Sequence, residues 1–377
     1  MTQNFEIKLV SWPQEDELER YSEYSGPFIS VTMAVHWSTL IRRSSTTPMD
    51  FMFYEVYQNQ DLVGVALLMR LKQLKAYRYL WTPVVDIIER FPLLKKCFPD
   101  QDIAFLEVPI SNYSGLFTHD AISAEQREEI YQTFAHHLSK EYPLHALCIK
   151  EDRADPDNIS DDNGNQFSFM PNTTLPLNYS SFDQFANSLT SKKRKKLRKD
   201  QKNAETAGVS ISIHDAPSEI AEQLYALYQN TNEKKKGQDD FLPTPLAIEH
   251  DFFQMLDSAN GLNAKAIVAK YEEEIIAYCL LMECDGILYF KSVGLDYHHS
   301  AKSNAYFNLF YKSIEYGIER GCKYIDYGVT SYYFKKRIGC EFHPTSYKVH
   351  FYSRFLTNFG GIFIKLIKKQ FSSFKFI

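Results

Sequence analysis

Apolar and polar residues follow one another along the chain in short alternating or wholly apolar runs, interrupted by segments with helical spacing. In the first half, strands are predicted over residues 51–58, 62–71, 103–110 and 144–150, and a helix over residues 124–141. The polar turn at 59–61 joins the first two strands into a hairpin. Ile130, Phe134 and Leu138 recur on one face of the helix, which predicts that this face is buried.

The second half repeats this order. Helices are predicted over residues 181–189, 191–207, 219–234 and 303–321, a hairpin over 264–286, and strands over 209–214, 287–296, 323–329 and 347–353. Gly237, Pro243 and Pro245 break the pattern between two of these segments and predict a loop. Each half thus offers hairpin, strand, helix and strand in turn, which indicates an internal duplication.

Length and charge agree with two units. The 377 residues suit two domains, which we place at residues 1–175 and 176–377. The net charge of −5 hides an asymmetry: the first unit holds 15 Lys and Arg against 25 Asp and Glu, and the second holds 27 against 22. The first unit is therefore a poor surface for a nucleic acid, whereas the second could receive a ligand that carries phosphate.

The six cysteines form no CxxC pair and no spacing typical of a metal site, so we expect buried thiols and no bound metal. The N-terminal segment lacks the features of a signal peptide, and no run of 18 apolar residues occurs. We therefore expect a cytoplasmic protein.

One segment of the second half has the order of an anion-binding site. The strand that ends at Gly294 is followed by a polar loop with Ser300, Lys302, Ser303 and Asn304, and then by a helix. The free backbone N–H groups at a helix N-terminus attract anions, so this segment is a candidate cradle for a pyrophosphate. An ordinary strand–loop–helix connection explains the same order, because no GxGxxG or GK[ST] motif is present.

From Leu189 to Gly339 the sequence combines several further features. A Lys/Arg run precedes a glycine and a strand, and a later strand carries Gly321, Asp326 and Gly328 before Phe334–Lys335. As a set, these features resemble the GNAT-type acyltransferases of the Fem-like group, which includes CelD-like acetyltransferase domains and peptidoglycan-bridge aminoacyltransferases. The first half is similar to the degenerate N-terminal GNAT unit of that group, through residues 53–68.

The resemblance implies an α/β (α+β) protein of two tandem GNAT-like domains, each with a mixed, largely antiparallel sheet flanked by helices. It implies direct N-acyl transfer from acyl-CoA, a co-substrate, to an amine of a small molecule or a cell-envelope precursor, with no permanently bound cofactor. Aminoacyl-tRNA is the alternative donor. The basic run favours it, whereas the acidic first half and the lack of a long helical-hairpin insertion argue against it. A non-catalytic module that retains the fold is a further alternative.

The resemblance also points to catalytic residues. A splay between strands 287–294 and 323–328 would expose backbone groups to the carrier. Tyr327 could then protonate the leaving group, Asp326 could contact the acceptor, and Lys335 could stabilise a phosphate or the transition-state charge. The structural alternatives are a strand tyrosine for Tyr327 and a turn cap for Asp326.

Residues 192–199 carry seven positive charges in eight positions. Arg194 and Arg198 share a helix face and match the family's run, so they are the candidates for phosphate contact, although a solvated helix is the alternative. Glu233, Asp239 and Asp240 are candidates for the catalytic base.

The C-terminal tail, residues 362–377, is both basic and apolar. It could lie on an anionic membrane as a peripheral contact, or dock on its own domain.

Overall fold

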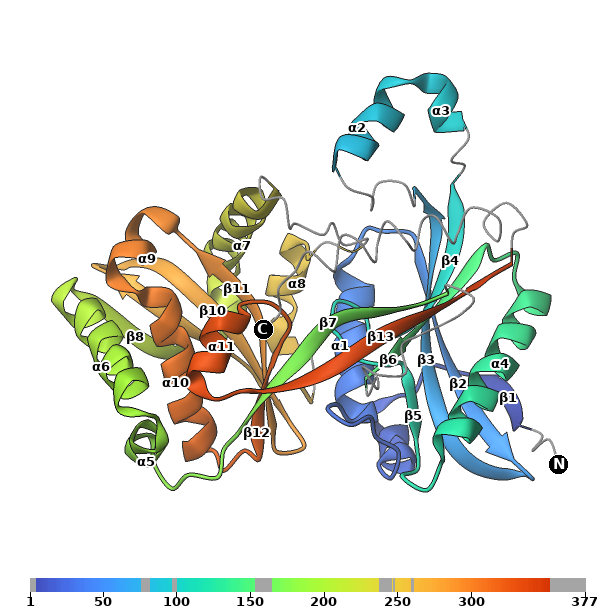
Figure 1. Ribbon diagram of the computed structural model, residues 1–377, viewed down its shortest axis with the longest axis horizontal. Coiled ribbons are helices and arrows are strands. Elements are labelled where there is room, and N and C mark those ends of the chain that lie inside the picture. The colour runs from blue at the N-terminus through green and yellow to red at the C-terminus, as the bar shows by residue number, and fades with distance from the viewer. Residues whose placement is uncertain are drawn as a thin grey trace.

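The computed structural model describes residues 5–75, 82–96, 100–152, 165–236, 246, 248–258 and 261–352. In these parts of the chain, thirteen strands form one sheet in the order β1-β2-β3-β4-β6-β13-β7-β12-β11-β10-β9-β8, with β5 paired to β3 (Figure 1). The sheet is mixed and mostly antiparallel, and helices flank it in both halves, as the sequence predicts.

The first half contains the helices α1 (Val31–Ser44), α2 (Thr82–Arg90), α3 (Pro92–Lys96) and α4 (Ala124–Glu141) and the strands β1 (Phe5–Val10), β2 (Met49–Gln58), β3 (Asp61–Leu74), β4 (Gln101–Leu106), β5 (Leu116–Thr118) and β6 (Ala146–Glu151). The predicted hairpin turn is confirmed: Asn59 and Gln60 connect β2 to β3 with φ angles of 51° and 76°. Two positive φ angles are typical of the tight turns that match strand twist.

The second half contains the helices α5 (Phe182–Ser188), α6 (Ser191–Thr206), α7 (Ala221–Lys236), α8 (His250–Gln254), α9 (Tyr297–Ser303), α10 (Ala305–Glu319) and α11 (Tyr332–Ile338) and the strands β7 (Gln166–Pro176), β8 (Val209–His214), β9 (Ala264–Tyr271), β10 (Glu274–Cys284), β11 (Ile287–Leu295), β12 (Tyr324–Gly328) and β13 (Glu341–Phe351). Each half has one parallel pair, β4 with β6 and β11 with β12, joined through α4 or α9–α10. This correspondence supports the predicted duplication.

The two halves meet in the middle of the sheet. β13 pairs with β6 on one edge and with β7 on the other. The chain therefore returns from the second half to complete the first, and the sheet continues across the predicted boundary at residue 175. The division into two domains remains an interpretation of the duplication.

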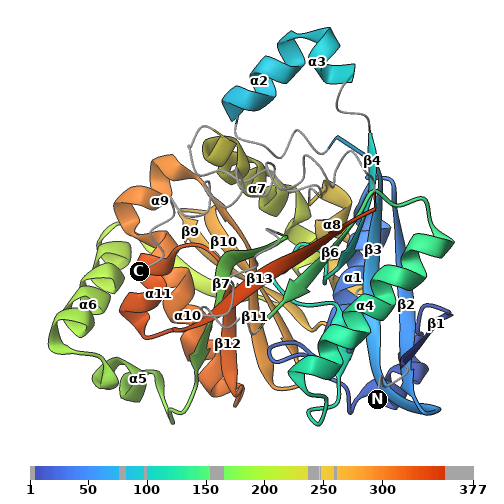
Figure 2. The same ribbon diagram turned by 45° about the vertical axis from the view of Figure 1, so that its right-hand side comes forward.

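Three main groups of buried side chains explain how the helices are placed. One group packs under α4 on the outer face of the first half, and another packs under α5, α6 and α10 on the outer face of the second. The largest group combines both halves, and in it Trp37 of α1 contacts Phe252 of α8 with ring centres 5.6 Å apart. Figures 1 and 2 show α1 and α8 between the halves, while α4 and α6 lie on the outside.

Most predicted elements are confirmed, but the loop expected between β11 and the next helix is wrong. Residues 297–303 form α9, because Asp296 caps a helix there by accepting a hydrogen bond from the backbone N–H of His298. The C-terminal tail, residues 362–377, and the segment with Asp239 and Asp240 lie outside the described residues. In the described parts of the chain, no helix is long and apolar enough to cross a membrane.

Candidate functional site

The two parallel strands of the second half separate before either of them ends. β11 and β12 are paired only from Ile287 to Tyr289 on one strand and from Tyr324 to Asp326 on the other. Beyond these residues β11 continues beside β10, and β12 continues beside β7. The predicted splay is thus confirmed. Past this point the backbone N–H and C=O groups on the facing edges of the two strands no longer form hydrogen bonds with each other.

A β-bulge lies in β11 where the splay begins. Cys279 of β10 is opposite Val293, whereas Leu281 is opposite Phe290, so β11 carries one residue more than its partner across this stretch. The extra residue falls at Lys291–Ser292. Bulges redirect side chains and are common beside active sites. Here the bulge falls at Lys291, two residues past the last residue of β11 that pairs with β12.

Lys291 lies among aromatic rings from both halves. Its Nζ is 5.0 Å from the ring centres of Trp37 and Tyr113 and 5.4 Å from that of Tyr289. The rings attract a cation but replace the water that would solvate it. Burial consequently lowers the pKa of Lys291 to about 8, although the negative charge of Asp326 opposes this shift. Part of the Lys291 population is therefore a neutral amine near pH 8.

Asp326 is held in one orientation at the end of the paired stretch. Its side chain is 2% exposed. One carboxylate oxygen accepts a hydrogen bond from Asn172 Nδ2 and the other from the backbone N–H of Gly328, both at 2.7 Å. The second bond caps the turn after β12, as the structural alternative for Asp326 predicts. Contact with an acceptor remains a prediction.

Two buried polar atoms beside Asp326 make no short, well-aligned hydrogen bond among the described residues, although the charge and a longer contact of Asp326 act on one of them. They are the hydroxyl of Tyr113, whose side chain is 1% exposed, and Oδ1 of Asn172, whose side chain is fully buried. Such atoms are costly unless water or a ligand satisfies them. Burial and the charge of Asp326 raise the pKa of Tyr113 well above its usual value, so its hydroxyl remains a donor. We call Asp326, Asn172, Tyr113 and Lys291 the junction cluster.

Lys335 lies on the other side of the turn that follows β12. Its ammonium group donates hydrogen bonds to the carbonyl oxygens of Tyr327 at 2.7 Å, Gly328 at 3.0 Å and Val329 at 2.8 Å. The side chain is 2% exposed, and burial lowers its pKa to about 7. Lys335 therefore fixes the backbone of the turn. To contact a carrier, as predicted, its ammonium group would have to break at least one of these three hydrogen bonds.

The turn that Lys335 holds has an unusual backbone. Thr330 and Ser331 have φ angles of 69° and 53°, in the left-handed region that residues with a Cβ rarely adopt. The hydroxyl of Tyr306 on α10 donates to Ser331 Oγ at 2.6 Å and helps to fix this conformation. Strain of this kind persists where the surroundings impose it, often at functional sites.

Tyr327 faces away from the junction cluster. Neighbouring residues of a strand point to opposite faces, so Tyr327 and Asp326 lie on different sides of the sheet. The Tyr327 hydroxyl is 3.0 Å from Ser313 Oγ, and its ring packs between Phe290 and Phe310. The structure thus gives Tyr327 the core role of the structural alternative, and its role as a proton donor remains a prediction.

The predicted pyrophosphate cradle contains a carboxylate of the protein itself. Asp200 of α6 is fully buried next to the start of α10. Its oxygens accept hydrogen bonds from Asn304 at 3.0 Å and Tyr311 at 3.1 Å, and Arg337 pairs with it at 2.8 Å. Lys196 adds a second ion pair at 2.8 Å. A helix N-terminus favours a negative charge, and at the start of α10 the carboxylate of Asp200 already supplies this charge.

The other residues of the cradle also have partners or positions inside the fold. Ser300 and Ser303 are buried, and the Ser303 hydroxyl donates to backbone carbonyls of α9. Gly294 permits close packing, because a Cβ there would lie 2.2 Å from the Tyr278 ring and 2.7 Å from the backbone of Leu227 in α7. Lys302 alone points into solvent. Pyrophosphate binding by this set remains a prediction.

The basic run forms α6, as predicted, and only a narrow stripe of side chains along this helix is buried. Leu197, Asp200 and Ala204 are its buried residues, while Arg198 is exposed. Arg194 is half-buried and donates to the carbonyl oxygen of Asn187 at 3.1 Å. The two arginines therefore differ in their freedom to contact phosphates, and Arg198 is the more accessible.

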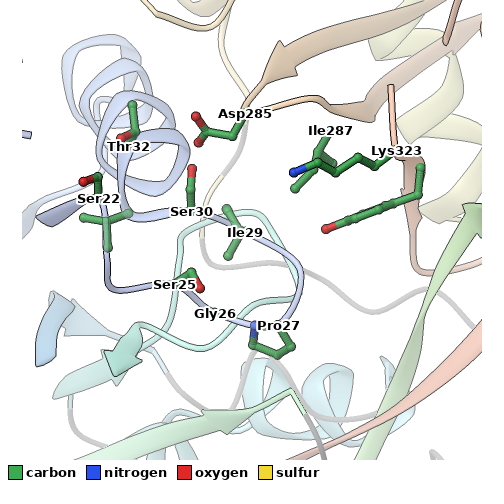
Figure 3. Close-up of a pocket in the computed structure, with 12 residues that line it drawn as sticks. Ser22, Ser25, Gly26, Pro27, Ile29, Ser30, Thr32, Asp285, Ile287 and Lys323 are labelled. Atoms are coloured by element: carbon green, nitrogen blue, oxygen red, sulfur yellow. The ribbon is translucent and has the colours of Figure 1, made fainter. Parts of the chain in front are cut away.

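A cavity of about 430 Å³ lies between the halves, at the opposite end of the paired stretch (Figure 3). Residues 22–32 line one wall, and the starts of β11 and β12 line the other. Figure 3 shows Asp285 near Ser30, with the amine of Lys323 pointing into the space. Hydroxyl groups and both signs of charge suit a small polar molecule. This cavity is separate from the junction cluster.

Comparison with known proteins agrees with this geometry. The sequence profile of the FemAB_like family, described as peptidoglycan biosynthesis/recognition, matches residues 116–370. The crystal structure of FemX is similar with a TM-score of 0.56 and 14% identity over 90% of this chain and 96% of that one. No curated protein sequence matches the chain at a significant level.

Two further solved structures share the fold. L-PGS from Bacillus licheniformis has a TM-score of 0.52 and 14% identity, over 96% of this chain and 97% of that one. A tandem GNAT protein from the clavulanic acid biosynthesis pathway has a TM-score of 0.51 and 11% identity, over 92% and 98%. Because the family match covers more than half of the sequence and the architecture agrees with it, this chain belongs to the FemAB_like family and is a transferase of acyl or aminoacyl groups.

Proposed function

We propose that this protein transfers an acyl or aminoacyl group to an amine of a cell-envelope precursor, at the junction cluster. The observation that carries the proposal is the position of Lys291 at a bulge where β11 and β12 separate, close enough to the fixed carboxylate of Asp326 for its charge to act on the pKa of the amine. The description of the family, peptidoglycan biosynthesis/recognition, supports a cell-envelope peptide as the class of acceptor.

The cluster offers a route for the proton of the acceptor. An acceptor amine arrives as an ammonium ion, which the carboxylate of Asp326 attracts, and it must lose a proton before it can attack. Neutral Lys291 takes that proton. The free amine then attacks the carbonyl carbon of the donor, forming a C–N bond, and the positive charge now on Lys291 stabilises the tetrahedral oxyanion. As the bond to the leaving oxygen or sulfur breaks, the proton passes from Lys291 to the leaving group. Lys291, neutral again, then takes the second proton from the attacking nitrogen, so that a neutral amide forms, and it releases this proton to solvent.

Tyr113 and Asn172 complete this assignment. Both offer a buried polar atom without a short, well-aligned hydrogen bond among the described residues, one a hydroxyl donor and the other an amide acceptor. A peptide acceptor carries both carbonyl and N–H groups, and it would satisfy the two atoms together. Their role is to orient the acceptor, because orientation converts binding energy into rate.

Acyl-CoA and aminoacyl-tRNA remain the two candidate donors. The carboxylate of Asp200 disfavours the pyrophosphate of CoA at the start of α10. The exposed cations of α6, together with exposed Lys302 and Lys336, favour a longer polyanion such as RNA. We therefore propose aminoacyl-tRNA as the donor to test beside acyl-CoA, which is the donor implied by the sequence resemblance.

A transfer assay tests both points. The purified chain is incubated with either mixed aminoacyl-tRNA or a panel of acyl-CoAs, and with a soluble peptidoglycan precursor that has a free side-chain amine. Mass spectrometry then detects the modified precursor. We expect product with one donor class and a loss of at least roughly 100-fold in Lys291→Met, the scale of general base catalysis. The exposed Lys140→Met variant is the matched control. Equal activity of Lys291→Met and Lys140→Met would refute the assignment of the site.

A further inference from the structure

The helices α2 and α3 form a small projection from the first half. Figures 1 and 2 show them standing apart from the sheet, at the end of the molecule where α7 and α9 also lie. The pair is tied together by Lys95 Nζ, which is 2.7 Å from Glu89 Oε2. Ile88 is 4% exposed, so the projection has an inner apolar side of its own.

The outer side of this projection is also apolar. Ile87 and Phe91 are each 53% exposed, and Leu93 is 78% exposed. These are three of the six large apolar side chains that are exposed among the described residues, although the projection spans only residues 82–96. Single exposed apolar residues are ordinary, but a cluster on one short element marks a surface that binds something.

The charges next to this cluster indicate the kind of surface that it meets. Arg90 and Lys96 are exposed beside the apolar residues, against one exposed acid, Asp86. Residues 82–96 hold three basic and two acidic residues, within a half that holds 15 against 25. The projection is thus a basic element on an acidic body. An anionic surface attracts this element and repels the remainder of the half.

The shape distinguishes a membrane from a folded protein partner. The apolar residues lie on a convex projection of two short helices, and bulky apolar side chains with flanking Arg and Lys are typical of elements that enter a lipid interface. We infer that the α2–α3 projection docks on an anionic lipid bilayer, with Ile87, Phe91 and Leu93 in the interface and Arg90 and Lys96 at the headgroups.

Vesicle binding by the full chain tests this inference. Sedimentation compares vesicles of phosphatidylcholine alone with vesicles that contain 30% phosphatidylglycerol. We expect binding to the anionic vesicles that weakens as salt rises from about 0.05 to 0.5 M, because the Debye length shortens. Combined substitution of Ile87, Phe91 and Leu93 by Ser should weaken it at least roughly tenfold, since binding scales with the apolar area inserted.

Two controls make the result specific. Leu9→Ser removes an apolar residue with the same 53% exposure from β1, and should leave binding unchanged. Arg90→Glu with Lys96→Glu should weaken binding to anionic vesicles alone. Wild-type binding that the triple variant retains would overturn the inference, as would the absence of vesicle binding. A wild-type dimer that the triple variant converts to a monomer, without vesicle binding, would instead identify a protein interface.

Discussion

Replacing Lys335 by Met should lower the free energy of unfolding and also change its dependence on pH. The buried ammonium group donates to three carbonyl oxygens at 2.7–3.0 Å, and Met can donate to none of them. With a pKa of about 7 the side chain is a neutral amine at pH 9 and keeps two N–H donors, so at about 1 kcal/mol for each hydrogen bond the loss there is roughly 2 kcal/mol. The turn of Thr330 and Ser331 should also loosen around the carbonyls of Tyr327 and Val329, whereas the Gly328 carbonyl keeps the hydrogen bond that Thr173 Oγ1 donates to it at 2.6 Å.

The dependence on pH follows from the pKa. Burial lowers the pKa of Lys335 from 10.5 to about 7. Between these values the unfolded chain carries one proton more than the folded protein, so the contribution of Lys335 to stability rises with pH, by at most about 1.4 kcal/mol per pH unit. It is lost as the pH falls toward 7. The advantage of the wild type over Lys335→Met should therefore grow by roughly 2 kcal/mol from pH 7 to pH 9.

Urea unfolding followed by circular dichroism at pH 7, 8 and 9 measures this difference. Other buried groups, such as Lys150 and Glu107, have pKa values near 7, but they are present in both proteins and cancel in the comparison. Lys336→Met removes an exposed lysine from the next position of α11, and its difference from the wild type should be constant with pH. A constant difference for Lys335→Met as well would show that the folded protein does not depress the pKa of this lysine.

Three further substitutions test the site and its supports. Lys291→Arg keeps the charge but cannot act as a base near pH 8, so its transfer rate should fall as far as that of Lys291→Met; a rate near wild type would leave only an electrostatic role. Asp200→Asn breaks the buried pair with Arg337 and should cost about 3 kcal/mol in urea unfolding, whereas a change below about 1 kcal/mol would contradict the importance of the pair. Gly294→Ala forces a Cβ against the Tyr278 ring and α7 and should destabilise by about 1–3 kcal/mol in urea unfolding, whereas an unchanged stability would contradict the close packing at this position.

The sequence predicts the strands and helices of this fold well where the pattern is long and regular. The predicted bounds of α4 agree with the structure to the residue, and both hairpins are found. The local pattern does not predict β7, and it predicts the start of β13 too late, at residue 347 instead of 341. These two strands pair with each other and with β6 and β12, so partners far away in the sequence decide their extent. The local pattern of apolar and polar residues does not depend on these distant pairings, so it cannot predict them.

The junction cluster shows the same limit for function. Asp326 is found from the sequence because it belongs to a motif. Lys291 carries only a weak signal, a single charge within the apolar strand Ile287–Leu295. Tyr113 and Asn172 carry none, since one follows β4 in the first half and the other lies on β7. Only the continuous sheet brings them to the end of β12.

Asp326 and Lys335 are close in sequence, yet they act on different sides of the same turn. The carboxylate of Asp326 accepts from the backbone N–H of Gly328, while Lys335 donates to the carbonyl oxygens of Tyr327, Gly328 and Val329. An acid on the donor side and a base on the acceptor side therefore clamp one short backbone segment at the splay. Because the clamp uses Asp326, Gly328 and Lys335, three of the five positions of the motif, part of this motif serves to build the opening between the strands. We propose that the chemistry inside the opening falls to side chains outside the motif, with Lys291 as the base.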